Sequence, residues 1–271
     1  DFRRVKGDIF RVSDRRQTGF GADSSTHLER VFMGKLNSTR WICQAGFIFD
    51  VDGARIVVDP YMSDSCAPRF PRMVKVPVPF ERLKPDFVLF SHDHRDHFDP
   101  ETVPTLYKLY KDCRFAGPLS TYEHFRAMGF DTLRFQTLSK GNAFDFGAFK
   151  VRPTTAYHSD PLAIGMLFDF DGKLVYFSGD TEFRDSLADD IISTAAGAPI
   201  DAVIICINGK LGNMNWRDAV KVVSKIKPKI AVPMHYGLFA GNTEDPKPFA
   251  AEVEKAGVKC VIASTSEPIA L

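Results

Sequence analysis

The sequence predicts a mixed α/β (α+β) fold, and two patterns lead to this expectation. In the C-terminal part, short apolar runs typical of buried strands alternate with segments whose apolar residues recur at helical spacing. Before them, apolar runs follow one another across glycine-containing turns, which is typical of antiparallel strands. The chain has 271 residues, 44% of them hydrophobic and 25% charged, so it can bury a sizeable core.

Residues 1–40 and residues 41–271 are expected to have different roles. The first segment is rich in arginine and poor in apolar periodicity, so we expect an N-terminal extension packed on or flanking the domain. From Trp41 onward the pattern is that of a folded domain. Its first predicted element is a hairpin, in which residues 47–49 pair with residues 56–58 across an Asp-Gly turn.

A proline-rich segment, residues 61–85, has almost no periodicity and is predicted to be a long loop. Loops of that length inside a compact domain are usually functional. A strand is predicted over residues 87–90. It precedes a helix with Asp99 as its N-cap and Pro100 at its first position.

A second helix is predicted to begin at Ser120, where Glu123 completes a capping box, and to end at Gly129. Residues 144–180 are then expected to form a run of antiparallel strands. The C-terminal part should alternate strand and helix. Helices are predicted from the cap Asn215 to Pro228 and over residues 246–256, and strands over residues 201–206, 230–232 and 261–263.

Composition and charge argue against several classes of function. A formal net charge of +1 disfavours a nucleic-acid surface, which would need a basic excess. No stretch approaches the apolar length of a membrane span, and the first residues contain no apolar segment, so neither a membrane anchor nor a signal peptide is expected. Five scattered cysteines favour free thiols in a reducing cytoplasm. A homo-oligomer remains open.

Four side chains that can bind metal, His92, His94, Asp96 and His97, follow an apolar run. Residues two apart in an extended segment point to the same side, so His92 and His94 can chelate one cation. Nitrogen and oxygen donors without thiolate suit Mn²⁺ or Zn²⁺, with Fe²⁺ as a further option, and favour catalysis. We expect one or two divalent cations. A solvated charged loop is the alternative, which is disfavoured because three of the chain's seven histidines fall here.

The cluster resembles the HxHxDH signature of the metallo-β-lactamase superfamily, whose members take further ligands from later strands. In this sequence His158, Asp180 and His235 each follow an apolar run, in the order that the superfamily shows. The resemblance implies a four-layer αββα sandwich, which the order of elements alone would not establish. It also implies that one metal is held by His92, His94 and His158, a second by Asp96, His97 and His235, and that Asp180 bridges them.

Within the superfamily, the chain is similar to the group that contains L-ascorbate-6-phosphate lactonase. The similarity extends from about Trp41 to the end and is carried by residues 90–97, 178–180 and 232–236 and by Asp245-Pro246. It implies hydrolysis of a small, anionic substrate, in which a metal-bound hydroxide attacks a carbonyl or phosphoryl centre and Asp96 carries a proton to the leaving group. Asp59 is either an acceptor for a ligand imidazole or a turn residue before Pro60.

Substrate contacts are expected from the loop that contains Asn208, Lys210 and Asn213, which departs from the lactonase pattern. Lys210 could bind a phosphate or carboxylate, or the loop could only cap the following helix. Tyr236 could donate a hydrogen bond to an oxyanion or only pack. Arg69 and Arg72 are expected to face solvent rather than the site, and His27 and His124 are expected at the surface.

Two other functions are alternatives to hydrolysis of a small substrate. A phosphodiesterase or nuclease on the same scaffold would need a basic track that this near-neutral chain does not show. A metal-binding protein without turnover is disfavoured by the complete set of ligands.

Overall fold

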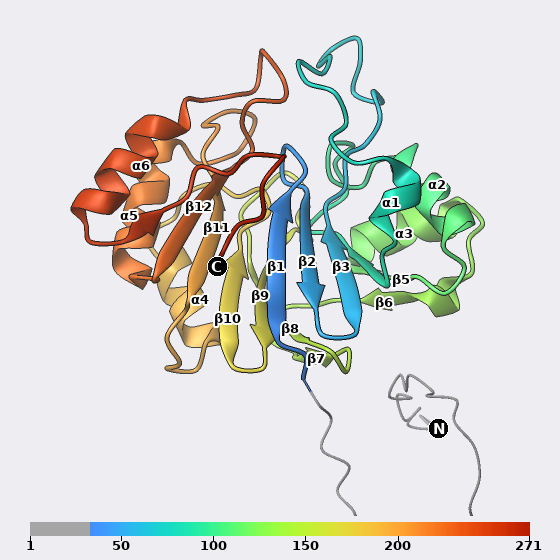
Figure 1. The fold of residues 1–271 in the computed structure, drawn as a ribbon, viewed down its shortest axis with the longest axis horizontal. Helices are drawn as coiled ribbons and strands as arrows, with labels where there is room; N and C mark the ends of the chain where they lie inside the picture. The colour runs from blue at the N-terminus through green and yellow to red at the C-terminus, as the bar shows by residue number, and fades with distance from the viewer. Residues whose placement is uncertain (1–32) are drawn as a thin grey trace, which may run out of the picture.

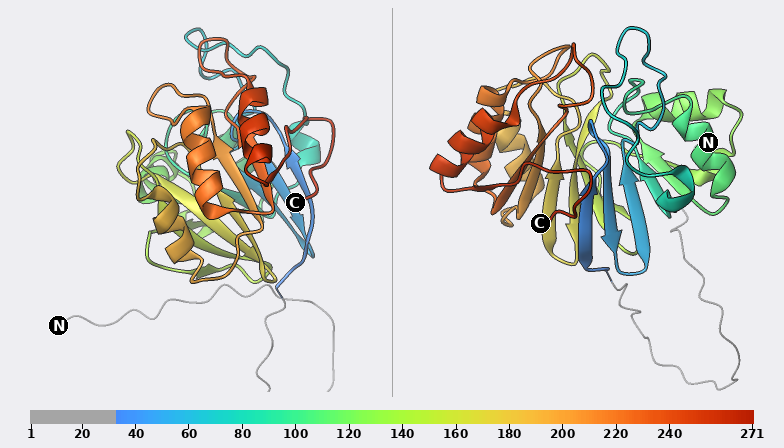
Figure 2. Two further views of the ribbon diagram at one scale, coloured as in Figure 1. Left: turned by 90° about the vertical axis from the view of Figure 1, so that its left-hand side faces the viewer. Right: turned by 45° about the horizontal axis from the view of Figure 1, so that its top comes forward.

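Two β-sheets stack face to face, and helices cover the outer surface of each, in a computed structural model that describes residues 33–271 (Figure 1). The layers follow one another as helix, sheet, sheet, helix (Figure 2). The predicted four-layer αββα sandwich is therefore confirmed. Of the extension expected over residues 1–40, residues 1–32 lie outside the described part of the chain, and so does His27.

The first sheet contains six strands within the described range, in the order of the sequence. Its first three strands are antiparallel, and the third to sixth run parallel. The predicted hairpin is confirmed, with Phe47 opposite Val58. The strands are β1 (Leu36–Trp41), β2 (Phe47–Val51), β3 (Ala54–Val58), β4 (Phe87–Leu89), β5 (Arg114–Gly117) and β6 (Phe135–Thr137).

β1 lies inside the segment that we expected to be an extension, so the sheet begins before Trp41. Its register against β2 shifts between Leu36 and Ser38. Such a bulge breaks the alternation of buried and exposed residues, which hides a strand from a search for period two. The boundary at residue 40 is therefore corrected to Leu36 for the start of the sheet.

The second sheet contains seven strands of the described chain, in the order β13-β12-β11-β10-β9-β8-β7. The antiparallel run predicted over residues 144–180 is present as β7 to β10, and β10 to β13 are parallel. The strands are β7 (Phe144–Asp145), β8 (Lys150–Thr155), β9 (Ile164–Phe170), β10 (Lys173–Phe177), β11 (Ala202–Cys206), β12 (Ile230–Met234) and β13 (Lys259–Cys260).

The final strand was predicted over residues 261–263, but β13 lies just before them. Val261 still donates its N–H to the Ala231 carbonyl oxygen, at 2.9 Å. The chain then leaves this sheet and crosses to the first one, where the Ile269 N–H donates to the Thr39 carbonyl oxygen. Residues 261–263 are apolar like a strand, but they begin the connection from the second sheet to the first.

Helices α1 to α3 cover the first sheet and α4 to α6 the second (Figures 1 and 2). α1 has four residues and interrupts the long predicted loop. Within residues 33–271, no helix has the length and apolar character needed to cross a membrane. The helices are α1 (Phe80–Leu83), α2 (Thr102–Leu109), α3 (Leu119–Ala127), α4 (Leu187–Thr194), α5 (Trp216–Ile226) and α6 (Pro246–Lys255), with the 3₁₀ helix η1 (Thr132–Arg134).

Asp99 does not cap α2 in the predicted way, because the helix begins at Thr102. The Asp99 carboxylate instead accepts hydrogen bonds from the Glu101 N–H and the Thr102 hydroxyl. This contact forms a turn before the helix and delays its start. At α5 the expectation is confirmed, since the Asn215 side chain accepts from the N–H groups of the first helical turn.

The capping box predicted at Ser120 is also wrong. α3 begins at Leu119, and the Ser120 hydroxyl donates to Asp160 at 2.6 Å. Glu123 pairs with Arg126 on the helix surface. A tertiary partner therefore competes successfully with the local cap, and the sequence signature alone does not reveal it. The predicted end at Gly129 is confirmed by its left-handed backbone, with φ of 74°.

Aromatic rings fill the space between the two sheets. The Phe49 ring centroid lies 5.3 Å from that of Phe168 and 5.5 Å from that of Phe170. Phe47 meets Phe177 edge to face across the same interface. Burial of each ring stabilises the fold by about 1.5–3 kcal/mol, so the sheets form a firm base for the loops at their ends.

Several strands end at one rim of the sandwich, the upper rim in Figure 1. β3 and β4 are parallel, β10 and β12 both run parallel to β11, and β8 and β10 are both antiparallel to β9. Strands of one direction deliver the residues that follow them to one edge. These residues are Asp59 after β3, the loop of residues 91–99 after β4, His158 after β8, Asp180 after β10 and His235 after β12.

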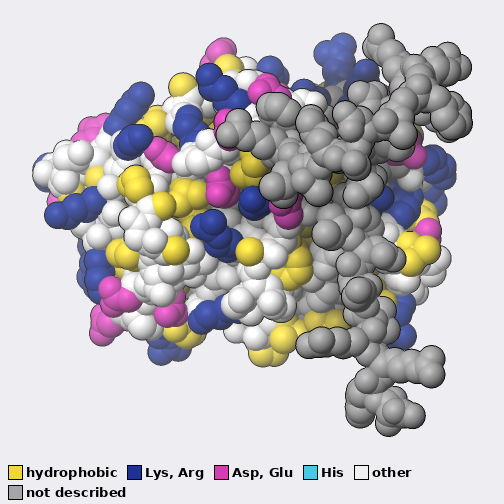
Figure 3. Space-filling model, turned by 90° about the horizontal axis from the view of Figure 1, so that it is seen from below, with side chains coloured by type: hydrophobic (Ala, Val, Ile, Leu, Met, Phe, Trp, Pro, Cys, Tyr) yellow, Lys and Arg dark blue, Asp and Glu magenta, His cyan; other side chains and the backbone are white. Residues whose placement is uncertain are grey.

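The opposite end of the molecule carries a mixed surface. In Figure 3, basic and acidic side chains are interspersed over the part not covered by grey residues. All five cysteines lie in the described range and are free, as predicted: Cys43, Cys66, Cys113, Cys206 and Cys260.

Candidate metal centre

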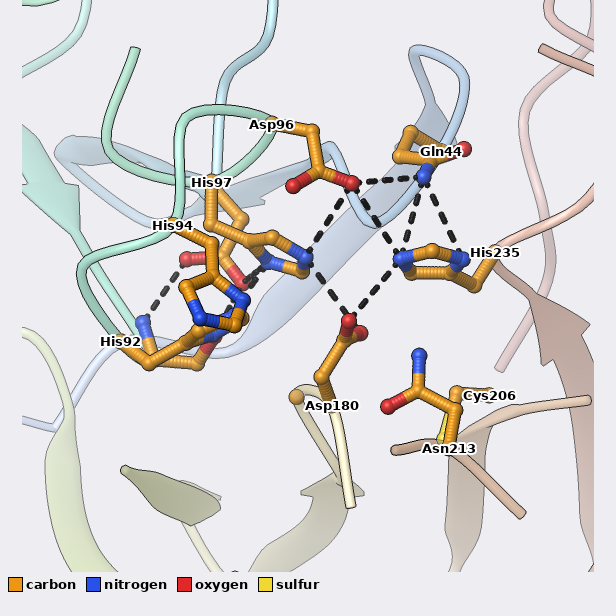
Figure 4. A network of polar contacts seen from close by, with 12 residues as sticks. Gln44, His92, His94, Asp96, His97, Asp180, Cys206, Asn213 and His235 are labelled. Atoms are coloured by element: carbon orange, nitrogen blue, oxygen red, sulfur yellow. Dashed lines mark hydrogen bonds and ion pairs between the residues drawn. The ribbon is translucent and has the colours of Figure 1, made fainter. Parts of the chain in front are cut away.

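Three imidazoles, from His92, His94 and His158, meet at the rim (Figure 4 shows His92 and His94). His94 Nδ1 and His158 Nε2 are 3.0 Å apart. Two nitrogen ligands of one cation, each about 2.0–2.1 Å from it, are spaced about 3 Å apart. The pair therefore has the spacing of ligands that share an ion.

A hydrogen bond on the other nitrogen fixes each of these rings. The Ser91 hydroxyl lies 2.9 Å from His92 Nδ1, the Gly212 carbonyl oxygen accepts from His158 Nδ1 at 3.1 Å, and the Ser159 hydroxyl lies 3.1 Å from His94 Nε2. Such contacts set the tautomer and leave the opposite nitrogen free to bind metal. His92 Nε2 is buried and has no hydrogen-bond partner among the described residues.

A second group, Asp96, His97 and His235, lies beside the first. His97 Nε2 is 3.8 Å from the Asp96 carboxylate, and His235 Nε2 is 3.4 Å from it. His97 Nδ1 donates to Asp59 at 2.7 Å, which again leaves Nε2 as the free donor atom. This group is a second candidate ligand set.

Asp180 lies between the two groups (Figure 4). Its carboxylate is 3.0 Å from His235 Nε2, 3.3 Å from His97 Nε2 and 3.9 Å from His158 Nε2. This position suits the bridging role that the resemblance implied. All seven predicted ligands are therefore brought together.

Asp59 supports the centre from behind. It is fully buried, and its carboxylate accepts hydrogen bonds from the Ser91 N–H, the Ser91 hydroxyl and His97 Nδ1. Of the two roles considered for Asp59, the structure shows the acceptor for a ligand imidazole. One carboxylate thus orients His97 directly and His92 through Ser91.

Gln44 is a residue that the sequence reasoning missed. It is fully buried, with φ of 52°, and its Nε2 donates to the Asp96 carboxylate at 2.8 Å (Figure 4). The same nitrogen is 3.0 Å and 3.2 Å from the two ring nitrogens of His235, so it lies over the face of that ring. The backbone carbonyl oxygen of Gln44 also accepts a hydrogen bond from the backbone N–H of His235. A lone polar residue in the apolar segment 41–47 was the available signal.

Charge accumulates in this buried space. Burial disfavours the ionised form of Asp180, but the imidazoles of His235 and His97 outweigh it and hold the pKa of that carboxyl well below its usual value. Burial likewise opposes protonation of His235, yet the Asp180 and Asp96 carboxylates raise its pKa to about 9. Burial and the neighbouring His97 lower the pKa of His92 well below normal, so this ring is neutral.

The donor set fits divalent cations. His92 Nε2 is buried without a hydrogen-bond partner among the described residues. His97 Nε2 and Asp180 Oδ1 form an ion pair at 3.3 Å but are likewise buried without a hydrogen bond, which is costly unless something else satisfies them. Imidazole nitrogens and carboxylate oxygens are ligands of Zn²⁺, Mn²⁺ and Fe²⁺. The residues would hold one cation at His92, His94 and His158 and a second at Asp96, His97 and His235, with Asp180 between.

A cleft of about 570 Å³ opens directly onto this centre. His94, Asp96 and Asp180 lie in its floor. Its walls come from the long loop after β3 and from the loops after β11 and β12. The other lining residues are Ser65, Cys66, Ala67, Arg69, Phe70, Arg95, Ser159, Leu211, Phe239 and Asn242.

The predicted substrate contacts do not line this cleft. Lys210 is exposed, and its Nζ contacts the Gly241 carbonyl oxygen at 3.5 Å. Asn208 and Asn213 are buried and hydrogen-bond to each other, at 3.0 Å. The Tyr236 hydroxyl donates to the Ala263 carbonyl oxygen, a contact that favours packing over substrate binding.

The two loop arginines differ. Arg69 is exposed and lines the cleft, while Arg72 is half-buried and donates to the Tyr61 and Ser63 carbonyl oxygens. The expected exposure to solvent is therefore confirmed for Arg69, although it also lines the cleft, and is wrong for Arg72. His124 lies at the surface as predicted, beside Asp93.

Residues 54–236 match the family model described as "Beta-lactamase superfamily domain". The chain belongs to the beta-lactamase superfamily. A UPF0173 metal-dependent hydrolase from Methanosarcina mazei is 28% identical over 243 residues, which cover 85% of this chain and 97% of the relative. Another, from Methanopyrus kandleri, is 26% identical over 235 residues, or 80% of this chain and 92% of the relative.

Solved structures share the beta-lactamase superfamily fold seen here. Igni18, a metallo hydrolase from Ignicoccus hospitalis, has a TM-score of 0.71 at 22% identity, covering 86% of this chain and 97% of that one. An isothiocyanate hydrolase from Delia radicum gut bacteria has a TM-score of 0.69 at 19% identity, covering 86% and 98%. At these identities the likeness establishes the fold of this superfamily member.

The first prediction concerns metal content. Metal-free protein supplied with Mn²⁺, Zn²⁺ or Fe²⁺ should retain one or two equivalents after desalting, measured by elemental analysis. The double variant His92→Ala, His94→Ala should lose at least one equivalent, because it removes two of the three imidazoles of one group. His124→Ala, which changes a surface histidine, is the control. Unchanged metal content in the double variant would rule out the assignment.

The second prediction concerns pH. A proton on His235, whose pKa is raised to about 9, competes with a cation for Nε2. Affinity at the Asp96, His97 and His235 group should therefore rise by at least about tenfold per pH unit from pH 7 to 9. Competition with a chelator of known affinity measures this, and a pH indicator follows the protons released. An affinity that stays constant or falls over this range would contradict the ligand role of His235.

Proposed function

We propose that this chain is a metal-dependent hydrolase whose substrate is a small organic anion, cleaved as in the lactonase-like group that contains L-ascorbate-6-phosphate lactonase. The observation that carries the proposal is the convergence of unpartnered ligand atoms at the floor of an open cleft. A structural metal site would be closed, whereas a site that faces a cleft leaves room for water and substrate. The two relatives are named metal-dependent hydrolases, which supports the same reaction class.

A divalent cation held by His92, His94 and His158, or by Asp96, His97 and His235, would lower the pKa of a coordinated water molecule and polarise the bond under attack. The protein supplies the positions of the ligands. Asp59 and the Gly212 carbonyl oxygen hold His97 and His158 in the orientation that directs Nε2 inward. The ligand nitrogens are thus held in position before the substrate arrives.

Asp96 is the residue to which we assign proton transfer. Its side chain is 17% exposed, against 5% for Asp180, so it is the ligand carboxylate that a substrate reaches more easily. Burial raises its pKa, but His97 and His235 outweigh this effect and keep the pKa below its usual value, so the group is ionised at neutral pH. Gln44 engages Oδ2, and Oδ1 is the atom assigned to receive a proton and pass it to the leaving group.

The shape of the site favours a small substrate over a polymer. A cleft of about 570 Å³ matches the size of small-molecule sites. A lactone or ester therefore suits the site better than a nucleic acid.

The third prediction is a test of turnover. Protein loaded with Mn²⁺, Zn²⁺ or Fe²⁺ is assayed on a panel of lactones, esters, phosphodiesters and amides, and lactones or esters should be cleaved. Asp96→Asn should lower kcat by about 10²-fold or more while KM changes little, because proton transfer rather than binding is lost.

Asp93→Asn is the matched control, since it neutralises a neighbouring carboxylate of the same loop that contacts His124 rather than the centre. It should retain nearly full activity. Near-normal turnover in Asp96→Asn would remove Asp96 from the mechanism. Loaded protein that cleaves nothing on the panel would leave the chain as a metal-binding protein and refute the proposed function.

A further inference from the structure

The geometry points to the chemical class of the substrate: a small organic anion with an apolar body, whose anionic group is held by Arg95 and Arg69. This inference rests on the proposed function, because it concerns the same cleft. It assigns the anionic group to Arg69 and Arg95 in place of Lys210.

Arg69 and Arg95 are the cationic side chains that line the cleft within the described chain. The acidic lining residues are Asp96 and Asp180, and both belong to the ligand set, so bound cations would neutralise them. The fixed charge around a substrate is then positive. An anion is the complementary partner.

The guanidinium groups retain free donors. Arg95 lies between two ligands in the metal loop, and within the described chain its Nη1 donates a long hydrogen bond, of 3.4 Å, to the Ser65 carbonyl oxygen. Arg69 rests on the Phe70 ring, 5.2 Å from its centroid, a contact that uses no N–H group. Arg72 offers a contrast, because its Nε and Nη1 donate to backbone carbonyl oxygens. Guanidinium forks with free N–H groups match carboxylate and phosphate oxygens.

Apolar side chains form much of the rest of the cleft wall. Phe70 and Phe239 line it, with their ring centroids 5.9 Å apart, and Leu211 lies at its mouth. Leu211 is 56% exposed and has a left-handed backbone, with φ of 54°. An exposed leucine beside the cleft offers an apolar surface to the body of a ligand. Leu211 is held there by the same turn whose Gly212 carbonyl oxygen orients His158.

The test measures binding rather than turnover. Calorimetry on metal-loaded protein compares 4-phenylbutyrate, its neutral isostere 4-phenylbutyramide, and acetate. Arg69→Ala and Arg95→Ala should each lower the affinity for 4-phenylbutyrate by about tenfold, the loss expected for one charge-assisted hydrogen bond. Binding of the amide should be unchanged. Arg126→Ala, an exposed arginine on α3, is the control and should change neither.

A second variant tests the apolar wall. Leu211→Asn keeps a side chain of similar size that tolerates the left-handed backbone but removes the apolar contact. This variant should lower the affinity for 4-phenylbutyrate several-fold and leave the affinity for acetate unchanged. Equal effects on both ligands would overturn the apolar half of the inference.

Metal content is measured for every variant, since Arg95 neighbours two ligands; if Arg95→Ala loses metal, Arg69→Ala decides the question. Unchanged affinity for 4-phenylbutyrate in Arg69→Ala, or a loss in Lys210→Ala instead, would overturn the assignment of the arginines. The proposed function fails separately, if loaded protein binds 4-phenylbutyrate through these arginines yet cleaves nothing on the panel.

Discussion

The structure depends on the electrostatic balance of one buried cluster. Imidazoles and carboxylates that would each cost several kcal/mol to bury alone are packed within a few ångströms of one another at the end of the sheets. The imidazoles of His235 and His97 lower the pKa of Asp180, and the Asp180 and Asp96 carboxylates raise the pKa of His235, so ion pairing offsets part of this cost. Even so, His92 Nε2 has no hydrogen-bond partner among the described residues. Metal binding would offset the free-energy cost of burying such an atom.

The αββα architecture makes the cluster possible. Phenylalanines between the sheets fix the strands, and strands of one direction deliver their polar successors to one rim. Around that rim, Asp59, Gln44 and the Gly212 carbonyl oxygen each hold a ligand by a hydrogen bond. Restraint of this kind keeps imidazole rings in place when no ion holds them.

Much of the centre could be predicted from the sequence because its information is local. The histidines of residues 92–97 lie close together in the chain. His235 directly follows the apolar strand β12, and Asp180 comes soon after the apolar strand β10. Gln44, Arg69 and Arg95 reach the site by the paths of loops, which no periodicity encodes. Lys210 illustrates the same limit. It follows a strand that ends at the correct rim, but its loop turns the side chain toward Gly241.

The fold was predictable to a similar degree. Hairpins and parallel strands follow from apolar runs and turn residues, whereas the bulge in β1 and the pairing of Ser120 with Asp160 depend on partners distant in the sequence. Local patterns thus located most elements but not all of their ends.

The most direct measurement of the central claim is anomalous diffraction from crystals soaked in Mn²⁺ or Zn²⁺, with data collected on both sides of the metal absorption edge. The account predicts an anomalous peak within bonding distance of His92 Nε2, His94 Nδ1 and His158 Nε2, or of the Asp96, His97 and His235 group, with Asp180 adjacent. Full metal occupancy elsewhere on the protein, with these side chains hydrogen-bonded only to one another, would contradict it.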